Sequence, residues 1–191
     1  MTYKHLSFVS LFAVAALSAS AQRNVENFNF GWQFHRGNID VTAIITSDGS
    51  WETINVPHDF QISQPWVAPA ANESEDSSDG ASNFKSRLSA RGFKEMGDGW
   101  YVKTYTPAAD MKGRRILLDF EGIMYVGDVY LNGKRIGGTD YGYLGFDIDV
   151  SKLLKYGQAN TIAVHASTSG PLNSRWYTGG GPVSYTHLTL P

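Results

Sequence analysis

One segment near the carboxyl end concentrates the residue types that bind sugars. Residues 171–181 carry Arg175, Trp176 and Tyr177, together with Asn173 and three consecutive glycines. Aromatic faces stack on the C–H surfaces of a sugar ring, while planar guanidinium and amide groups donate hydrogen bonds to its hydroxyls. The same composition also suits a glycine-rich turn packed by Trp176. The residues by themselves leave a sugar site and a structural turn as open alternatives.

A second place to look for chemistry is the neighbouring pair His58 and Asp59, which follows Pro57. An imidazole beside a carboxylate can support acid–base catalysis. Adjacent residues on an extended chain point to opposite sides, however, and no serine is placed to complete a nucleophilic triad. These two residues are therefore predicted to build a turn.

Two pairs of carboxylates have the i, i+2 spacing that puts both side chains on one face of a strand. They are Asp119 with Glu121, and Asp147 with Asp149. In both pairs the carboxylates alternate with apolar residues, so they lie on the polar side of their strands. Both pairs are predicted to be solvated surface.

Residues 65–97 differ in composition from the rest of the chain and are predicted to form a long insertion. An acidic run, with Glu73, Glu75, Asp76 and Asp79, is followed by a basic stretch. The acidic run lacks the central glycine and terminal bidentate glutamate of a calcium-binding loop, so we predict a solvated loop and no metal site. The basic half suits either docking onto a neighbouring domain or lining a carbohydrate cleft.

Length and composition limit the class of protein. The 191 residues suffice for one domain with a sizeable core, but not for a (β/α)₈ barrel beside it. A net charge of -2 gives no basic excess, which argues against nucleic acid as a partner. There is no cysteine, so disulfides, thiol catalysis and cysteine-bound metal are excluded.

The first 21 residues have the pattern of a secretory signal peptide. A basic Lys4 precedes an apolar run from Leu6 to Leu17, and Ala19-Ser20-Ala21 is a small-residue cleavage site. The apolar run is too short to span a bilayer, so no membrane span is predicted. We expect cleavage near Ala21/Gln22 and a periplasmic or secreted protein.

The remaining chain alternates with the period of two that indicates β-strands. Residues 116–150 give three or four antiparallel strands, with a hairpin at Asn132-Gly133. Further strands are predicted at 27–34, 51–56, 99–107 and 161–166, with a short helical turn over 152–156. About eight strands without a convincing long helix predict an all-β sandwich. Four alternating aromatic residues in the first strand are predicted to fill its core, namely Phe28, Phe30, Trp32 and Phe34.

Four segments occur in an order that resembles the amino-terminal jelly-roll domain of glycoside hydrolase family 2, the family of β-galactosidases, β-glucuronidases and β-mannosidases. They are WETINVPHDF from Trp51, YLNGKRIGG from Tyr130, DYGYLGFDIDVS from Asp140 and LLKYGQANTIAV from Leu153. The resemblance covers about residues 25–181. It implies a jelly-roll β-sandwich over 22–181, similar to galactose-binding domains.

The resemblance also implies a role for the loop described first. In this family a segment like SRWYTGGG ends the jelly roll, and its loop reaches the sugar-binding subsite at the mouth of the catalytic barrel. Arg175, Trp176 and Tyr177 are therefore expected on the substrate side. Retaining hydrolysis uses two carboxyl groups about 5 Å apart. In this family both are barrel glutamates, so we expect no catalytic residue, metal or cofactor in this chain.

The last ten residues depart from the family pattern. After the glycine run the family continues with a strand resembling GIYRDV, whereas residues 182–191 read PVSYTHLTLP. That sequence resembles the translation of a transposon-based sequencing adapter. We predict that these residues are not biological and that the chain is a truncated product.

Together these features predict the carbohydrate-binding domain of an exported retaining β-glycosidase, most like the β-galactosidases. The expected partners are an oligosaccharide and the downstream domains of the same chain. Two alternatives remain. One is a free-standing carbohydrate-binding module without hydrolase activity, and the other is a structural or adhesion domain without a sugar site.

Overall fold

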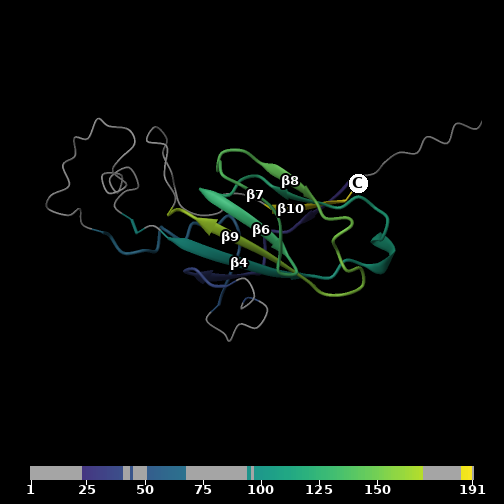
Figure 1. The fold of residues 1–191 in the computed structure, drawn as a ribbon, viewed down its shortest axis with the longest axis horizontal. Helices are drawn as coiled ribbons and strands as arrows, with labels where there is room; N and C mark the ends of the chain where they lie inside the picture. The colour runs from purple at the N-terminus through teal and green to yellow at the C-terminus, as the bar shows by residue number, and fades with distance from the viewer. Residues whose placement is uncertain are drawn as a thin grey trace, which may run out of the picture.

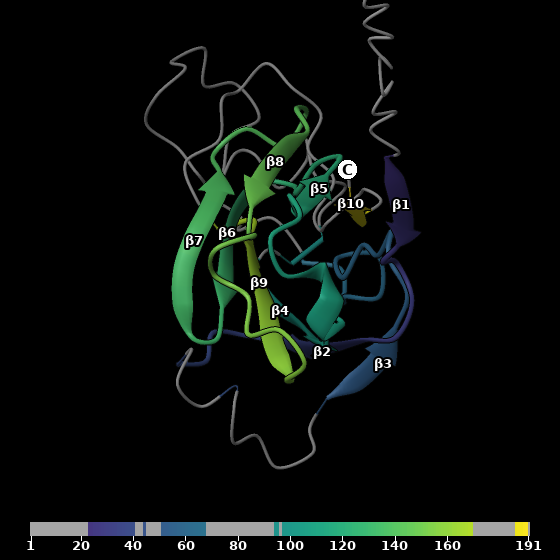
Figure 2. The same ribbon diagram turned by 90° about the vertical axis from the view of Figure 1, so that its right-hand side faces the viewer.

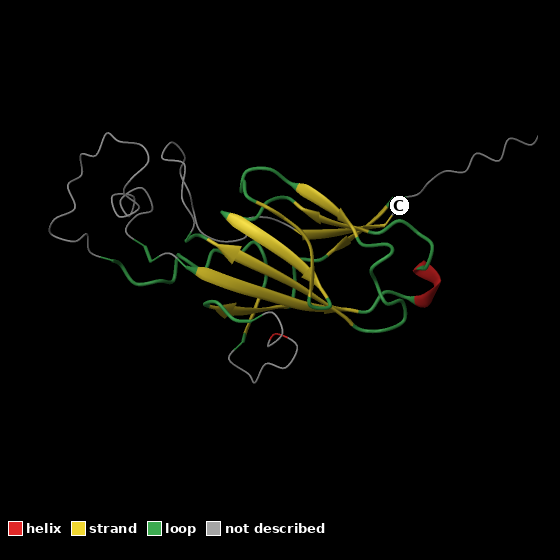
Figure 3. Cartoon of the chain, in the orientation of Figure 1, coloured by secondary structure: helices red, strands yellow, loops and turns green. Residues whose placement is uncertain are grey.

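The computed structural model describes residues 23–40, 44, 51–67, 94–95, 97–169 and 186–190. These residues fold into two antiparallel β-sheets that face each other (Figure 1, Figure 3). The strands are β1 (Asn24–Asn27), β2 (Trp32–Arg36), β3 (Glu52–Ile54), β4 (Asp98–Tyr105), β5 (Leu117–Phe120), β6 (Val126–Leu131), β7 (Lys134–Thr139), β8 (Phe146–Asp149), β9 (Asn160–Ser167) and β10 (Thr186–Leu190). A single 3₁₀ turn, η4 (Ala109–Met111), lies between β4 and β5. The all-β sandwich prediction is confirmed, with ten strands among the described residues where about eight were expected.

The two sheets divide the strands unequally. One sheet has six strands in the order β3-β2-β4-β9-β6-β7, and the other has four in the order β1-β10-β5-β8. Figure 2 shows the four strands of the smaller sheet lying side by side. Within the described residues no helix is long and apolar enough to cross a membrane.

The core lies between the two sheets and is built by the alternation that the sequence predicts. In β5, Leu118 and Phe120 are buried while Asp119 faces outward, and in β6, Val129 and Leu131 follow the same rule. Large side chains from both sheets are completely enclosed, among them Trp32, Tyr101, Phe28, Phe60, Ile116 and Ile123. Apolar burial of this kind is the main force that holds a cysteine-free sandwich together.

The predicted strand over 27–34 is wrong at its centre. The structure has two strands here, because Gly31 adopts a φ of 71° that breaks the extended backbone. Phe28 and Trp32 are buried as expected, and the Trp32 indole N–H donates to the Phe28 carbonyl at 2.8 Å. Phe30 is turned outward and is 61% exposed.

Of the two turns predicted from the sequence, the hairpin is found and the helical turn is not. Asn132 and Gly133 have φ values of 51° and 82° between β6 and β7, so the expected hairpin is confirmed. No helix forms over 152–156, where the chain makes hydrogen-bonded turns and ends them at Gly157 with a φ of 70°. Ser151 does not cap a helix, because its hydroxyl accepts the Ile116 N–H at 2.8 Å and bonds Asp149.

The strand β10 completes the smaller sheet. It runs antiparallel to both neighbours, pairing Leu188 with Leu118 of β5 on one side and with Glu26 of β1 on the other. Among the described strands, β1 pairs with β10 alone. The tail that resembles an adapter thus occupies an interior position of the sheet, while its origin in an adapter stays a prediction.

Candidate functional site

The candidate site is built at one end of the six-stranded sheet. Register places Arg36, Gly99, Ala166, Gly127 and Thr139 in one row across five neighbouring strands. At this row β2, β7 and β9 are near their ends, and β4 and β6 have just begun. We call this the loop end, because residues 170–185 follow directly from it.

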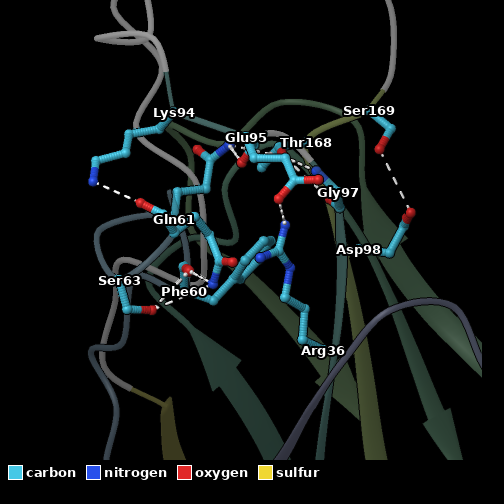
Figure 4. Close-up of polar contacts among 11 residues, drawn as sticks. Arg36, Phe60, Gln61, Ser63, Lys94, Glu95, Gly97, Asp98, Thr168 and Ser169 are labelled. Atoms are coloured by element: carbon cyan, nitrogen blue, oxygen red, sulfur yellow. Dashed lines mark hydrogen bonds and ion pairs between the residues drawn. The ribbon is translucent and has the colours of Figure 1, made fainter. Parts of the chain in front are cut away.

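Two buried polar side chains tie the chain together at the loop end (Figure 4). The hydroxyl of Thr168 accepts the Gly97 N–H at 3.0 Å and the Gln61 amide at 3.2 Å. The same Gln61 amide also donates to the Glu95 carbonyl at 3.2 Å. Gln61 is 4% exposed and Thr168 is 1% exposed, so these bonds are shielded from water. They fix the points at which the 68–93 and 170–185 segments join the sandwich.

Charged side chains surround this buried pair. Arg36 and Glu95 form an ion pair at 3.2 Å, and the Lys94 ammonium donates to the Gln64 carbonyl at 2.7 Å. Lys94 also lies 4.0 Å from the centroid of the Trp66 ring, a cation–π contact. Trp66 is itself 71% exposed. Polar and aromatic groups are thus gathered at the same end of the domain.

A histidine, an aspartate and a serine also meet at the loop end, but not as a nucleophilic triad. The His165 Nε2 lies 3.0 Å from Asp98 Oδ1, and the Ser169 hydroxyl reaches Asp98 Oδ2 at 3.5 Å. A triad needs the imidazole between the nucleophile and the carboxylate. Here the carboxylate is in the middle, so the arrangement orients side chains and cannot activate Ser169. His165 is therefore a hydrogen-bonded residue of strand β9.

His58 lies against the core rather than in an open site. Its Nδ1 is 3.0 Å from the Tyr101 hydroxyl, and its ring packs edge-on against Phe34. Burial lowers the pKa of His58, outweighing the nearby carboxylates of Glu52 and Asp59, which act to raise it. Burial also raises the pKa of the Tyr101 phenol. The pair is therefore neutral and structural near neutral pH.

This environment gives a pH dependence with a defined sign. Because the folded-state pKa of His58 is below the ordinary histidine value of 6.5, the unfolded chain binds more protons than the folded chain as the pH falls below that value. The stabilising contribution of neutral His58 to the free energy of unfolding is fully present above pH 6.5. It is lost as the pH falls through the folded-state pKa of His58. An NMR titration of the His58 ring is expected to show a midpoint below 6.5. A midpoint at or above 6.5 would contradict this.

One cavity between the two sheets is too small for a sugar. The cavity lined by Trp32, Val56, Tyr101, Ile123 and Val164 measures about 10 Å³, the size of a single water. No cluster of three or more histidine, aspartate or glutamate side chains that could hold a metal occurs within the described residues.

The sites predicted from the sequence separate into three groups. Arg175, Trp176 and Tyr177 lie outside the described residues, as do the signal segment and most of the 65–97 insertion. Asp59 builds the predicted turn, since its carboxylate accepts the Gln61 N–H at 2.9 Å. The carboxylate pairs are on the surface as expected, with Asp119 opposite Asp147 in the β5–β8 ladder.

Sequence reasoning missed the Gln61, Asp98 and Thr168 connections. Gln61 and Thr168 are 107 residues apart, and neither belongs to a motif. The available signal was indirect, because both follow segments that the strand pattern brings to the same end of a sheet. Only the strand order shows that they meet.

Comparison with known proteins supplies the family. Residues 87–171 match the family model described as "Glycosyl hydrolase 2 galactose-binding domain-like". A β-glucuronidase from Formosa agariphila is 32% identical over 90% of this chain, and β-galactosidase BoGH2A from Bacteroides ovatus is 28% identical over 88%. In each case the chain spans 18% of the relative's length.

Solved structures agree with the sequence comparison. A glycosyl hydrolase family 2 member from Bacteroides cellulosilyticus superposes with a TM-score of 0.68 at 33% identity, over 87% of this chain and 20% of that one. A β-glycosidase from Bacteroides vulgatus gives a TM-score of 0.67 at 29% identity, again over 20% of its length. The hairpin at Asn132-Gly133, expected from the sequence, is present in this chain. The chain therefore carries the amino-terminal, galactose-binding-like domain of glycoside hydrolase family 2.

Proposed function

We propose that this chain is the carbohydrate-binding amino-terminal domain of an exported, retaining β-glycosidase that acts on β-galactosides. In this proposal Met1–Ala21 directs export, and the mature protein is periplasmic or secreted. The catalytic carboxylates belong to a barrel domain outside this chain, which therefore has no hydrolase activity of its own. The domain contributes to holding the sugar beside that barrel.

The observation that carries the proposal is the correspondence with one domain of much longer enzymes. The family model covers 87–171, and the relatives include enzymes named β-galactosidase and β-glucuronidase of which the chain spans about a fifth or less. Galactosides are the proposed substrates because relatives such as BoGH2A from Bacteroides ovatus are named β-galactosidase.

The loop end supports a role in sugar binding. The Gln61–Thr168 bonds anchor the strand from which residues 170–185 leave, and that segment carries Arg175, Trp176 and Tyr177. A ligand-binding loop on a rigid scaffold is a common arrangement. We propose that the two aromatic rings stack on the sugar and that the guanidinium binds its hydroxyls.

The activity is tested on the longer gene. Long-read sequencing of the source DNA beyond the Gly181 codon should show a continuous frame through further domains. The expressed full-length enzyme is expected to release the chromophore from a nitrophenyl β-galactoside with retention of configuration, and to act more slowly on the β-glucuronide. A frame that stops near Gly181, or a preference for the glucuronide, would contradict the proposal.

The binding role is tested on the same enzyme with a matched pair of variants. Trp176→Ala is expected to raise KM for the galactoside about tenfold, as expected when an aromatic anchor is lost. Phe30→Ala removes an exposed ring from the opposite end of the six-stranded sheet and is expected to leave KM unchanged. If the two substitutions changed KM equally, the proposed sugar-binding role of Trp176 would be contradicted.

A further inference from the structure

The loop between β7 and β8 displays apolar side chains to solvent. Tyr141 is 42% exposed, Tyr143 is 47% exposed and Leu144 is 64% exposed. The two tyrosine rings are 5.7 Å apart between centroids and tilted by 57°. Because the two rings are not stacked face to face, neither ring covers the flat face of the other. We call these three residues the tyrosine platform.

The backbone under the platform is held in place by close packing. A Cβ added to Gly142 would lie 2.5 Å from the Met124 sulfur, and one added to Gly145 would lie 3.0 Å from the Phe120 carbonyl oxygen. The loop is therefore pressed against the sandwich at both glycines. The Thr139 hydroxyl accepts the Tyr141 N–H at 3.1 Å and donates to the Tyr141 carbonyl at 3.0 Å. A loop backbone fixed in this way loses little conformational entropy on binding a ligand.

The platform lies at the loop end. Thr139, the last residue of β7, belongs to the same row as Ala166 of β9. Tyr141 follows it by two residues, just as Thr168 follows Ala166. The tyrosine platform and the segment after Ser169 therefore leave the same sheet at the same end, separated by the width of β6. Figure 1 shows the β7–β8 connection on the side where the β9 arrow ends.

The charges around the platform are acidic. Asp140 precedes Tyr141 in the chain, and Asp147 follows Leu144 by three residues, in β8. The nearby Arg135 is engaged by Asp128 at 2.6 Å. Carboxylates within about 10 Å repel an anionic ligand at moderate salt. A uronic acid or sulfated sugar is thus disfavoured here, whereas the C–H faces of a neutral sugar suit exposed aromatic rings.

We propose that Tyr141, Tyr143 and Leu144 form a second glycan-binding site, which takes consecutive units of a neutral oligosaccharide. The proposal rests on the proposed function, because it assumes that this domain binds carbohydrate. The tilt between the rings fits successive sugar units whose faces are turned relative to each other. The platform consists of residues other than Arg175, Trp176 and Tyr177.

The test uses the whole chain with two tetrasaccharides, a neutral galactotetraose and an acidic tetramer of uronic acid. Binding is measured by titration calorimetry, and aromatic NMR signals of Tyr141 and Tyr143 are followed in the unmodified chain. The double variant Tyr141→Ala/Tyr143→Ala is expected to bind galactotetraose about tenfold more weakly. Phe30→Ala is the control, since it removes an exposed aromatic ring that is remote from the loop end.

The outcomes separate this site from the proposed function. Selective shifts of the two tyrosine signals by galactotetraose, with weaker binding by the double variant alone, support the platform. Unchanged binding by the double variant, together with a loss in Trp176→Ala, overturns the platform and leaves the proposed function standing. Equal affinity for the uronic acid tetramer overturns the preference for a neutral glycan. No binding of either sugar by the unmodified chain overturns both proposals.

Discussion

Replacement of Asn160 by alanine is expected to lower the free energy of unfolding by about 3 kcal/mol or more. Asn160 begins β9, is completely buried, and joins three separate parts of the chain. Its side-chain oxygen accepts the Lys155 N–H at 2.9 Å and the Asn132 amide at 3.0 Å. Its amide donates to the carbonyls of Lys155 at 2.9 Å, Gln158 at 3.0 Å and Tyr105 at 3.4 Å.

The size of the effect follows from the partners that alanine leaves behind. Each buried polar group without a hydrogen bond costs about 1–3 kcal/mol, and several would be stranded together. Denaturant unfolding monitored by tryptophan fluorescence gives the free energy directly. Asn160→Asp keeps the volume but loses the donor, so it should destabilise comparably. Gln158→Ala is the control, because only the backbone carbonyl of Gln158 takes part. A loss below 1 kcal/mol for Asn160→Ala would contradict the account.

The second large effect is expected from a proline in β10. Leu188→Pro removes an N–H from a strand that has partners on both sides, at a cost of about 3 kcal/mol. The consequence should extend to β1, whose pairing among the described strands is with β10 alone. Residues 24–27 are all exposed, so no buried side chain holds them in place once the ladder is broken.

Hydrogen exchange measured by mass spectrometry can follow both strands in one experiment. In the Leu188→Pro chain, the amides of Asn24–Asn27 are expected to exchange at the rate of an unpaired segment. β4 and β9, in the other sheet, should keep their protection. Leu188→Val, which suits a strand, should behave as the parent chain. Retained protection of β1 in the proline variant would show that its order does not depend on β10.

Much of the fold could be predicted because its signals are local. The alternation in β5 and β6 and the turn at Asn132-Gly133 depend on residues close in sequence, and both are found as expected. The outward turn of Phe30 was missed, because Gly31 could have continued a strand as well as broken it. Local pattern does not distinguish these two conformations of glycine.

The candidate site was less accessible to sequence reasoning, for a different physical reason. Gln61 and Thr168 are ordinary polar residues until the strand order brings them together, and the same holds for Asp98 and His165. Arg175, by contrast, was singled out by composition alone, which says what a loop can bind without fixing its geometry. Composition thus predicted a ligand class, while tertiary structure was needed to find the scaffold that supports the loop.

The position of β10 has a consequence for the order of folding. Among the described strands, β1 pairs with β10 alone, so β1 can join its sheet only after Thr186–Leu190 has been synthesised. A ribosome-bound chain shorter than this can form the six-stranded sheet but leaves its amino-terminal strand unpaired. Closure of the smaller sheet is therefore a late event with a large loop to close, which is intrinsically slow.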